Sequence, residues 1–196
     1  MSQPSDLEID QLRRVAHELR EVFAERGYRV DSAMEVDPAF GSGMARGAMA
    51  RDLAIDAISG AASRHGLDFR PVNGSGREFR CFSGGVDRRY RMRKARRVRE
   101  GTYVIPANSD SALATDEGSL LQEETWVLGY TIGADMLVDD VFVAPVLGRV
   151  EGHPGHLVLG RIIELLTADA PTVGFQPTDE PLPGFEDDNE SGEFGF

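Results

Sequence analysis

Residues 87–100, DRRYRMRKARRVRE, crowd eight cations into one short segment of an otherwise acidic chain. On a helix the apolar residues of this segment would not form one stripe, whereas in an extended chain alternate side chains share a face. The alternation therefore predicts a strand with Tyr90 and Met92 on one face and a row of five arginines on the other. These arginines are Arg89, Arg91, Arg93, Arg97 and Arg99.

The arginine row has two interpretations. Guanidinium groups at alternate positions would form an anion-binding surface, because each offers a planar fork to phosphate or carboxylate. Together with Tyr90 as a stacking side chain, this surface would suit a nucleic-acid backbone. Alternatively, the arginines pair with neighbouring Asp and Glu on an ordinary solvated sheet face. The acidity of the whole chain, with a net charge of −12, argues against nucleic acid, since typical binders are basic.

Charge is divided unevenly along the 196 residues. Residues 1–100 hold 19 cations and 15 anions, a net charge of +4, and residues 101–196 hold 2 and 18, a net charge of −16. Such asymmetry indicates either a polyanion-binding region or pairing between the two halves. Lysine occurs once against 20 arginines, which indicates a gene from a GC-rich bacterium or its phage.

Composition also excludes several classes of protein. No apolar run approaches the roughly 20 residues that a membrane helix needs, so no membrane partner is expected. The first ten residues are polar and acidic, unlike a secretory signal. Cys81 is the only cysteine, which excludes an internal disulfide framework and a multi-cysteine zinc site. We therefore expect a cytoplasmic protein.

Two helices are predicted in the first third of the chain. The first runs from Asp6 to Arg26, because apolar residues recur there at helical spacing after a capping box formed by Ser5 and Glu8. The second covers residues 44–64, and its apolar stripe includes one charged residue, Arg51. The residues between the two helices, 31–43, are predicted to form a loop.

From Leu67 onwards the pattern changes to short runs rich in β-branched and aromatic residues. Turn sequences at 83–85 and 133–135 would join consecutive strands. Because no helical pattern intervenes, the strands should form an antiparallel sheet, curled or sandwiched. The predicted fold class is α+β, with a helical N-terminal unit over residues 1–66 and an antiparallel β domain over residues 67–168.

The remaining residues, 169–196, contain four prolines, eight acids and no cations. Such a composition predicts disorder, since too little apolar surface can be buried. Phe185, Phe194 and Phe196 are candidate docking residues, because aromatic side chains in an acidic segment suit an apolar pocket rimmed by cations. Over residues 185–196 alone, the tip resembles the acidic, Phe-terminated tails of bacterial single-stranded-DNA-binding proteins. Nothing upstream resembles the oligonucleotide-binding domain of that family.

Evidence for catalysis is weak in the sequence. His153 and His156 flank a Pro-Gly turn and would diverge, and there is no His-Glu-x-x-His helix. Asp139 and Asp140 could serve a nuclease, but adjacent residues of a strand point to opposite faces. Cys81 lacks any context typical of a nucleophile, and the chain has neither a Gly-x-Ser-x-Gly elbow nor a Walker loop. We assign no catalytic residue, metal or cofactor.

These observations predict a non-enzymatic binding or adaptor protein. It would dock a protein partner through the acidic, Phe-containing tail and the arginine-rich strand. One alternative is a nucleic-acid-binding regulatory protein that uses residues 88–99. A second alternative is a metal-dependent hydrolase or nuclease.

Overall fold

The computed structural model describes residues 2–37, 42–72, 76–107, 122–152 and 155–167. Its helices are α1 (Asp6–Arg26), α2 (Tyr28–Glu35) and α3 (Gly43–His65). Its strands are β1 (Asp68–Pro71), β2 (Arg77–Ser83), β3 (Val86–Lys94), β4 (Arg96–Arg99), β5 (Thr102–Val104), β6 (Pro106–Ala107), β7 (Gln122–Ile132), β8 (Val138–Val150), β9 (Gly155–Leu159) and β10 (Ile163–Leu166). The segment predicted to be disordered lies outside the described residues.

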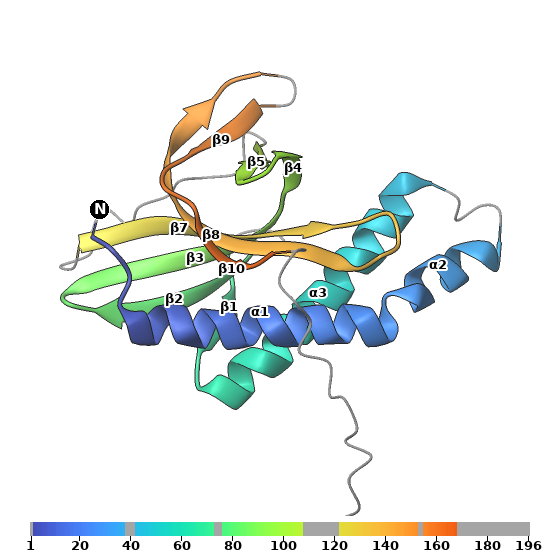
Figure 1. Cartoon of the computed structure of the whole chain (residues 1–196), viewed down its shortest axis with the longest axis horizontal. Helices are drawn as coiled ribbons and strands as arrows, with labels where there is room; N and C mark the ends of the chain where they lie inside the picture. The colour runs from blue at the N-terminus through green and yellow to red at the C-terminus, as the bar shows by residue number, and fades with distance from the viewer. Residues whose placement is uncertain (1, 38–41, 73–75, 108–121, 153–154, 168–196) are drawn as a thin grey trace, which may run out of the picture.

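The predicted α+β fold is confirmed, with helices first and a sheet after them. The main sheet has the order β1-β2-β3-β7-β8-β9-β6, and β10 also pairs with β8. All of its pairs are antiparallel except β3 with β7, which is parallel. Helices α1 and α3 cover one face of the sheet, while β4, β5 and β9 rise on the opposite side (Figure 1).

Helix α1 has the predicted bounds and the predicted start. Ser5 and Glu8 form the capping box, in which each side chain accepts a hydrogen bond from the backbone N–H of the other. Gly27 follows the helix with ordinary right-handed angles, so its role is a close approach. A Cβ at Gly27 would lie 2.5 Å from the backbone oxygen of Met136. The predicted loop over 31–43 is partly wrong, because its first residues belong to α2.

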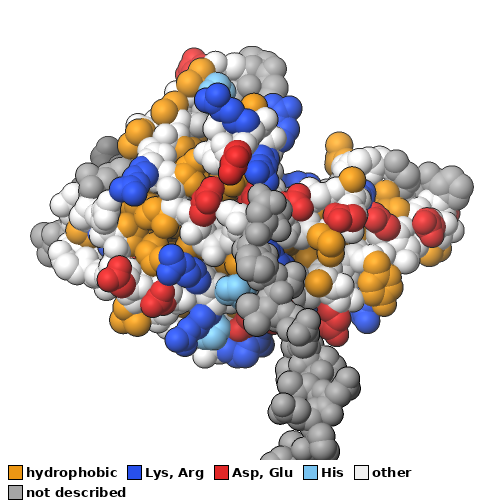
Figure 2. Space-filling view, viewed as in Figure 1, with side chains coloured by type: hydrophobic (Ala, Val, Ile, Leu, Met, Phe, Trp, Pro, Cys, Tyr) orange, Lys and Arg blue, Asp and Glu red, His pale blue; other side chains and the backbone are white. Residues whose placement is uncertain are grey.

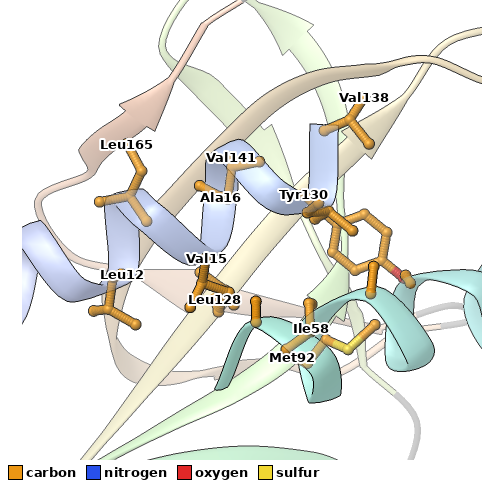
Figure 3. Close-up of a cluster of buried hydrophobic side chains, with 14 of the residues drawn as sticks. Leu12, Val15, Ala16, Ile58, Met92, Leu128, Tyr130, Val138, Val141 and Leu165 are labelled. Carbon is orange, nitrogen blue, oxygen red and sulfur yellow. The ribbon is translucent and has the colours of Figure 1, made fainter. Parts of the chain in front are cut away.

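The principal hydrophobic core lies between the helices and the sheet (Figure 3). Leu12, Leu19 and Phe23 of α1 have no exposed surface, and neither does Ile58 of α3. They belong to one cluster of buried side chains with Leu128 and other residues of β2, β3, β7, β8 and β10. Helices α1 and α3 therefore share a single core with the main sheet.

A second cluster lies on the opposite face of β7 and β8. The rings of Tyr103 and Phe142 stack there with centroids 4.1 Å apart, and Ile105 and Val127 are also buried in this cluster. Strands β7 and β8 are thus covered on both faces. This double coverage explains why their sequences are nearly continuous apolar runs instead of alternating ones.

Gly129 on β7 is required by the packing of this second cluster. A Cβ at this position would lie 2.3 Å from the ring of Phe142. We expect Gly129→Ala to lower the free energy of unfolding by about 1–3 kcal/mol, as overpacked cores do. Urea unfolding should show no such loss for Gly60→Ala, because a Cβ there meets only the flexible guanidinium of Arg64, at 3.5 Å. A stable Gly129→Ala protein would contradict the close packing.

The single strand predicted over residues 87–100 is wrong in one respect. It is two strands, β3 and β4, which belong to different sheets. The break falls at Ala95, which is buried in the second cluster and whose N–H donates to the backbone oxygen of Tyr130 at 2.8 Å. Beyond Ala95 the chain pairs with β5, whose Tyr103 is buried in the same cluster as Ala95. Arg97 and Arg99 consequently do not continue the face of β3.

Candidate anion-binding site

Two arginines of the predicted row are ion-paired within the sheet. Arg89 donates from Nη2 to Oε1 of Glu123 at 2.5 Å, and its Nε lies 3.6 Å from Oδ2 of Asp87. Arg91 lies with Nε 3.7 Å from Oε2 of Glu78. Asp87 and Glu78 are both buried. Removing either arginine would therefore take a neighbouring cation away from a buried carboxylate.

The neighbouring strands supply further cations to the same acids. Arg80 of β2 donates from Nε to Oδ2 of Asp87 at 2.8 Å, and Arg70 of β1 donates to Oε1 of Glu78 at 3.2 Å. This part of β1, β2 and β3 matches the alternative interpretation, a sheet face on which arginines pair with acids. On the face of the molecule seen in Figure 2, basic and acidic side chains are likewise interspersed.

The other predicted residues lie apart from Arg89 and Arg91. Arg97 on β4 has Nη1 3.6 Å from Oδ1 of Asp140, and Arg99 donates from Nε to Oγ1 of Thr102. Tyr90 is fully buried, and its hydroxyl donates to Oε1 of Glu8 at 2.7 Å. In this position the Tyr90 ring offers no open face to a base. The predicted residues thus do not form one continuous surface.

Arg93 borders a pocket. The pocket has a volume of about 170 Å³ and lies between α3 and the ends of β2, β3 and β7. Its described lining residues are Gly47, Arg51, Ile55, Arg77, Met92, Arg93, Lys94 and Tyr130. Four of these side chains are cations, and none of the described lining residues is an acid. The described lining of the pocket is therefore basic.

Arg93 lacks an acidic neighbour in the described residues. Its Nη1 donates to the backbone oxygen of Met92 at 3.1 Å, and no described carboxylate forms an ion pair with it. Burial lowers the pKa of its guanidinium, and the like charges of Arg91 and Arg51 lower this pKa further. The group nonetheless stays protonated, since arginine does not lose its proton in proteins. The pocket thus holds positive charge that an anion would relieve.

Tyr130 forms part of the wall of the pocket. Its ring extends from β7 towards α3, with the hydroxyl oxygen beside that helix (Figure 3). The residue is only 2% exposed, and its hydroxyl makes no hydrogen bond with the described residues. Burial raises the pKa of Tyr130 to about 12. At neutral pH it is therefore a neutral hydrogen-bond donor.

Sequence reasoning missed four members of this site: Arg51, Arg77, Lys94 and Tyr130. Lys94 belongs to the arginine-rich segment but not to its predicted anion-binding face. Arg51 carried a signal, because it is a cation within the apolar stripe of α3. Arg77 and Tyr130 carried none, since each stands in an ordinary strand sequence. Only the packing of α3 across the ends of β2, β3 and β7 brings the residues together.

A separate buried network involves Arg88. Its Nη1 donates to Oε2 of Glu8 at 3.1 Å and its Nε donates to Oε2 of Glu124 at 3.2 Å. The indole N–H of Trp126 also donates to Glu124, at 3.2 Å, and Arg88 reaches the backbone oxygen of Gln3. These groups satisfy one another away from solvent. The network joins the start of the chain to β3 and β7 and has a structural role.

The residues considered for a nuclease do not converge. Asp140 is buried and its Oδ2 accepts a hydrogen bond from the hydroxyl of Thr131 at 3.3 Å. Asp139 is partly exposed, and burial together with the charges of Asp135 and Asp140 raises its pKa. Among the described residues no group of three or more His, Cys, Asp or Glu side chains could hold a metal ion.

Two further candidates can be located in part. His156 is exposed on β9, whereas His153 lies outside the described residues. Cys81 packs against the principal core, and burial raises its pKa to about 12. Its thiol is thus protonated at neutral pH, which does not favour a nucleophilic role.

The proposed docking residues Phe185, Phe194 and Phe196 lie outside the described residues, so their role stays a prediction. None of the helices that the structure describes is long and apolar enough to cross a membrane. No protein-family model matches the chain, and comparison with curated proteins and with solved structures likewise finds no match.

Proposed function

We propose that the protein is a non-enzymatic binding or adaptor protein that holds an anionic group of a protein partner in the basic pocket. The observation that supports this function is the pocket between α3 and β3, where four cations meet and no described acid lines the wall. An arginine fork binds phosphate or carboxylate in a fixed geometry. The partly buried position of Arg93 strengthens such an interaction, because charges attract more strongly away from bulk water.

The chemistry of the lining favours binding over catalysis. Arginine offers donors and no acceptor, and it does not exchange its proton near neutral pH. A general base or nucleophile must reach the reacting group, and the described lining contains neither a histidine, a carboxylate nor a thiol. The acidic tail remains a proposed second contact, through Phe185, Phe194 and Phe196.

Nucleic-acid binding is the second candidate function. Exposed cations continue from the pocket along the chain at Lys94, Arg96, Arg97 and Arg99. Such a series could follow a phosphate backbone beyond the pocket. The net charge of −12 opposes this alternative, because it repels a long polyanion.

Binding of two labelled probes would test these functions. We expect the protein to bind an oligo-glutamate peptide at low salt, and Arg93→Gln with Lys94→Gln to weaken this binding. A matched control is Arg13→Gln with Arg14→Gln, which removes two cations from the exposed face of α1. If single-stranded DNA is the true ligand, the pocket variant should also reduce the slope of log K against log salt by about 1.4, since each lost phosphate contact contributes about 0.7.

Equal losses in the pocket variant and the α1 variant would contradict a specific basic site. The same measurement on protein lacking residues 169–196 addresses the tail. Because the tail carries eight acids and no cations, it should compete for the cations at low salt. Its removal is expected to strengthen binding of both probes, and added salt should erase the difference. Unchanged binding would leave the tail as a separate docking arm.

A further inference from the structure

The basic pocket contains a feature that a solvated cluster of cations does not need. Tyr130 as a whole is only 2% exposed, and its hydroxyl hydrogen-bonds to no described residue. It lines the same pocket as Arg51 and Arg93, so the site combines a neutral hydrogen-bond donor with its cations. An acceptor that enters the pocket would therefore meet both kinds of donor.

The donors around the pocket come from four elements. Arg51 projects from α3, Arg77 from β2, Arg93 from β3 and Tyr130 from β7. A ligand that accepts hydrogen bonds from several directions suits this arrangement better than a planar ligand does. A carboxylate offers two oxygens in one plane, whereas a phosphate monoester offers three terminal oxygens arranged around phosphorus. The monoester also carries close to two negative charges at neutral pH.

We propose that this pocket binds the phosphate monoester group of a phosphorylated protein partner, an inference that rests on the proposed anion-binding function. Arg93 and Arg51 hold the terminal oxygens through their guanidinium groups, and the neutral hydroxyl of Tyr130 donates a further hydrogen bond. Lys94 is exposed at the edge of the pocket and adds charge without a fixed geometry.

Charge favours a phosphorylated peptide as the source of this phosphate. A phosphodiester in a nucleic-acid backbone carries a single negative charge and two terminal oxygens. A phosphate monoester offers one more terminal oxygen and nearly twice the charge to the donors of the pocket. The net charge of −12 also disfavours a long polyanion more than a short phosphorylated peptide.

Calorimetric titration of the full chain with three probes at constant ionic strength tests the proposal. The probes are a short phosphoserine peptide, the same peptide with glutamate in place of phosphoserine, and a single-stranded oligonucleotide with a 5′-phosphate. We expect the phosphoserine peptide to bind at least about tenfold more tightly than the glutamate peptide, because charge-assisted hydrogen bonds to the added oxygens distinguish the two.

Variants then connect this preference to the pocket. Arg93→Gln should weaken phosphoserine binding by about tenfold, and Tyr130→Phe by about threefold to tenfold. Tyr130→Phe keeps the ring in the core and removes only the unpartnered hydroxyl, so the melting temperature of the free protein should not fall. The controls, Arg14→Gln on α1 and Tyr28→Phe on α2, alter exposed residues away from the pocket and should bind as the unaltered protein does.

The possible results separate the two proposals. Equal affinity for the phosphoserine and glutamate peptides would overturn the phosphate inference and leave the anion-binding function standing. Binding of neither peptide would overturn both. Tightest binding of the 5′-phosphorylated oligonucleotide would overturn the protein source. Unchanged phosphoserine binding in both Arg93→Gln and Tyr130→Phe would show that the phosphate sits elsewhere and would overturn the assignment of this pocket.

Discussion

Replacing Leu19 with Asp should unfold the protein. The side chain has no exposed surface and lies in the core that α1 shares with the sheet. A carboxylate there would lose its hydration and find no built partner, which costs several kcal/mol. Since a typical domain is stable by only about 5–15 kcal/mol, we expect loss of the helical circular-dichroism signal or a large fall in melting temperature.

Leu7→Asp is the matched control for this variant. Leu7 lies on the same helix and undergoes the same chemical change, but it is 72% exposed. Its substitution should leave the melting temperature close to that of the unaltered protein, because surface changes shift stability little. A melting temperature unchanged in Leu19→Asp as well would mean that α1 does not pack on the sheet in solution.

Local signals in the sequence predicted the elements that depend on local physics. The capping box and the apolar spacing around Leu19 gave the bounds of α1, because both act within one or two turns of helix. The turn at 83–85 likewise joins β2 to β3, and its glycines, Gly84 and Gly85, adopt the positive φ angles that such a turn requires.

Features set by distant contacts could not be predicted in the same way. Ala95, where β3 ends, is buried in the second cluster with residues of β5 and β8. The pattern of residues within 87–100 does not indicate that these strands lie nearby. The parallel pairing of β3 with β7 depends on how the intervening chain crosses over. Each requires knowledge of which segments meet in space, which alternation alone does not supply.

The arginine row illustrates the same limit at the candidate site. In the sequence, Arg89 and Arg93 are equivalent members of one alternating pattern. In the structure Arg89 meets Glu123, 34 residues away, whereas Arg93 meets other cations beside Tyr130. Only the fold distinguishes an arginine that pairs with a described acid from one that does not.

Replacing Arg88 with Ala should lower the free energy of unfolding about as much as placing a charge in the core does, as in Leu19→Asp. The side chain is 3% exposed and lies between two buried acids, with Nη1 3.1 Å from Glu8 and Nε 3.2 Å from Glu124. Its removal would leave both carboxylates buried with no cation between them. Breaking a buried ion pair on one side costs about 3–5 kcal/mol, and urea unfolding at neutral pH should report a loss of that size.

The pH dependence of this loss has a definite sign. In the unaltered protein the pKa of Glu124 is lowered: burial acts to raise it, but hydrogen bonds from the Ser2 N–H and Trp126 and the charge of Arg88 outweigh burial. Glu124 therefore stabilises the fold above its unfolded pKa, and this contribution is lost as pH falls through the folded pKa. Without the charge of Arg88, the Glu124 carboxylate should titrate at higher pH than in the unaltered protein, and its protonation would reduce the cost of burying it. The stability gap between the two proteins should accordingly narrow on acidification.

Two comparison variants separate the buried charge from a general effect of losing an arginine. Arg99→Ala removes an exposed arginine of β4 and should change the free energy of unfolding little. Arg88→Met combined with Glu8→Gln and Glu124→Gln removes all three charges and should recover part of the stability lost in Arg88→Ala, because no carboxylate is then buried unpaired. If Arg88→Ala were as stable as Arg99→Ala at neutral pH, the carboxylates would have to be solvated, and the network could not hold the start of the chain against the sheet.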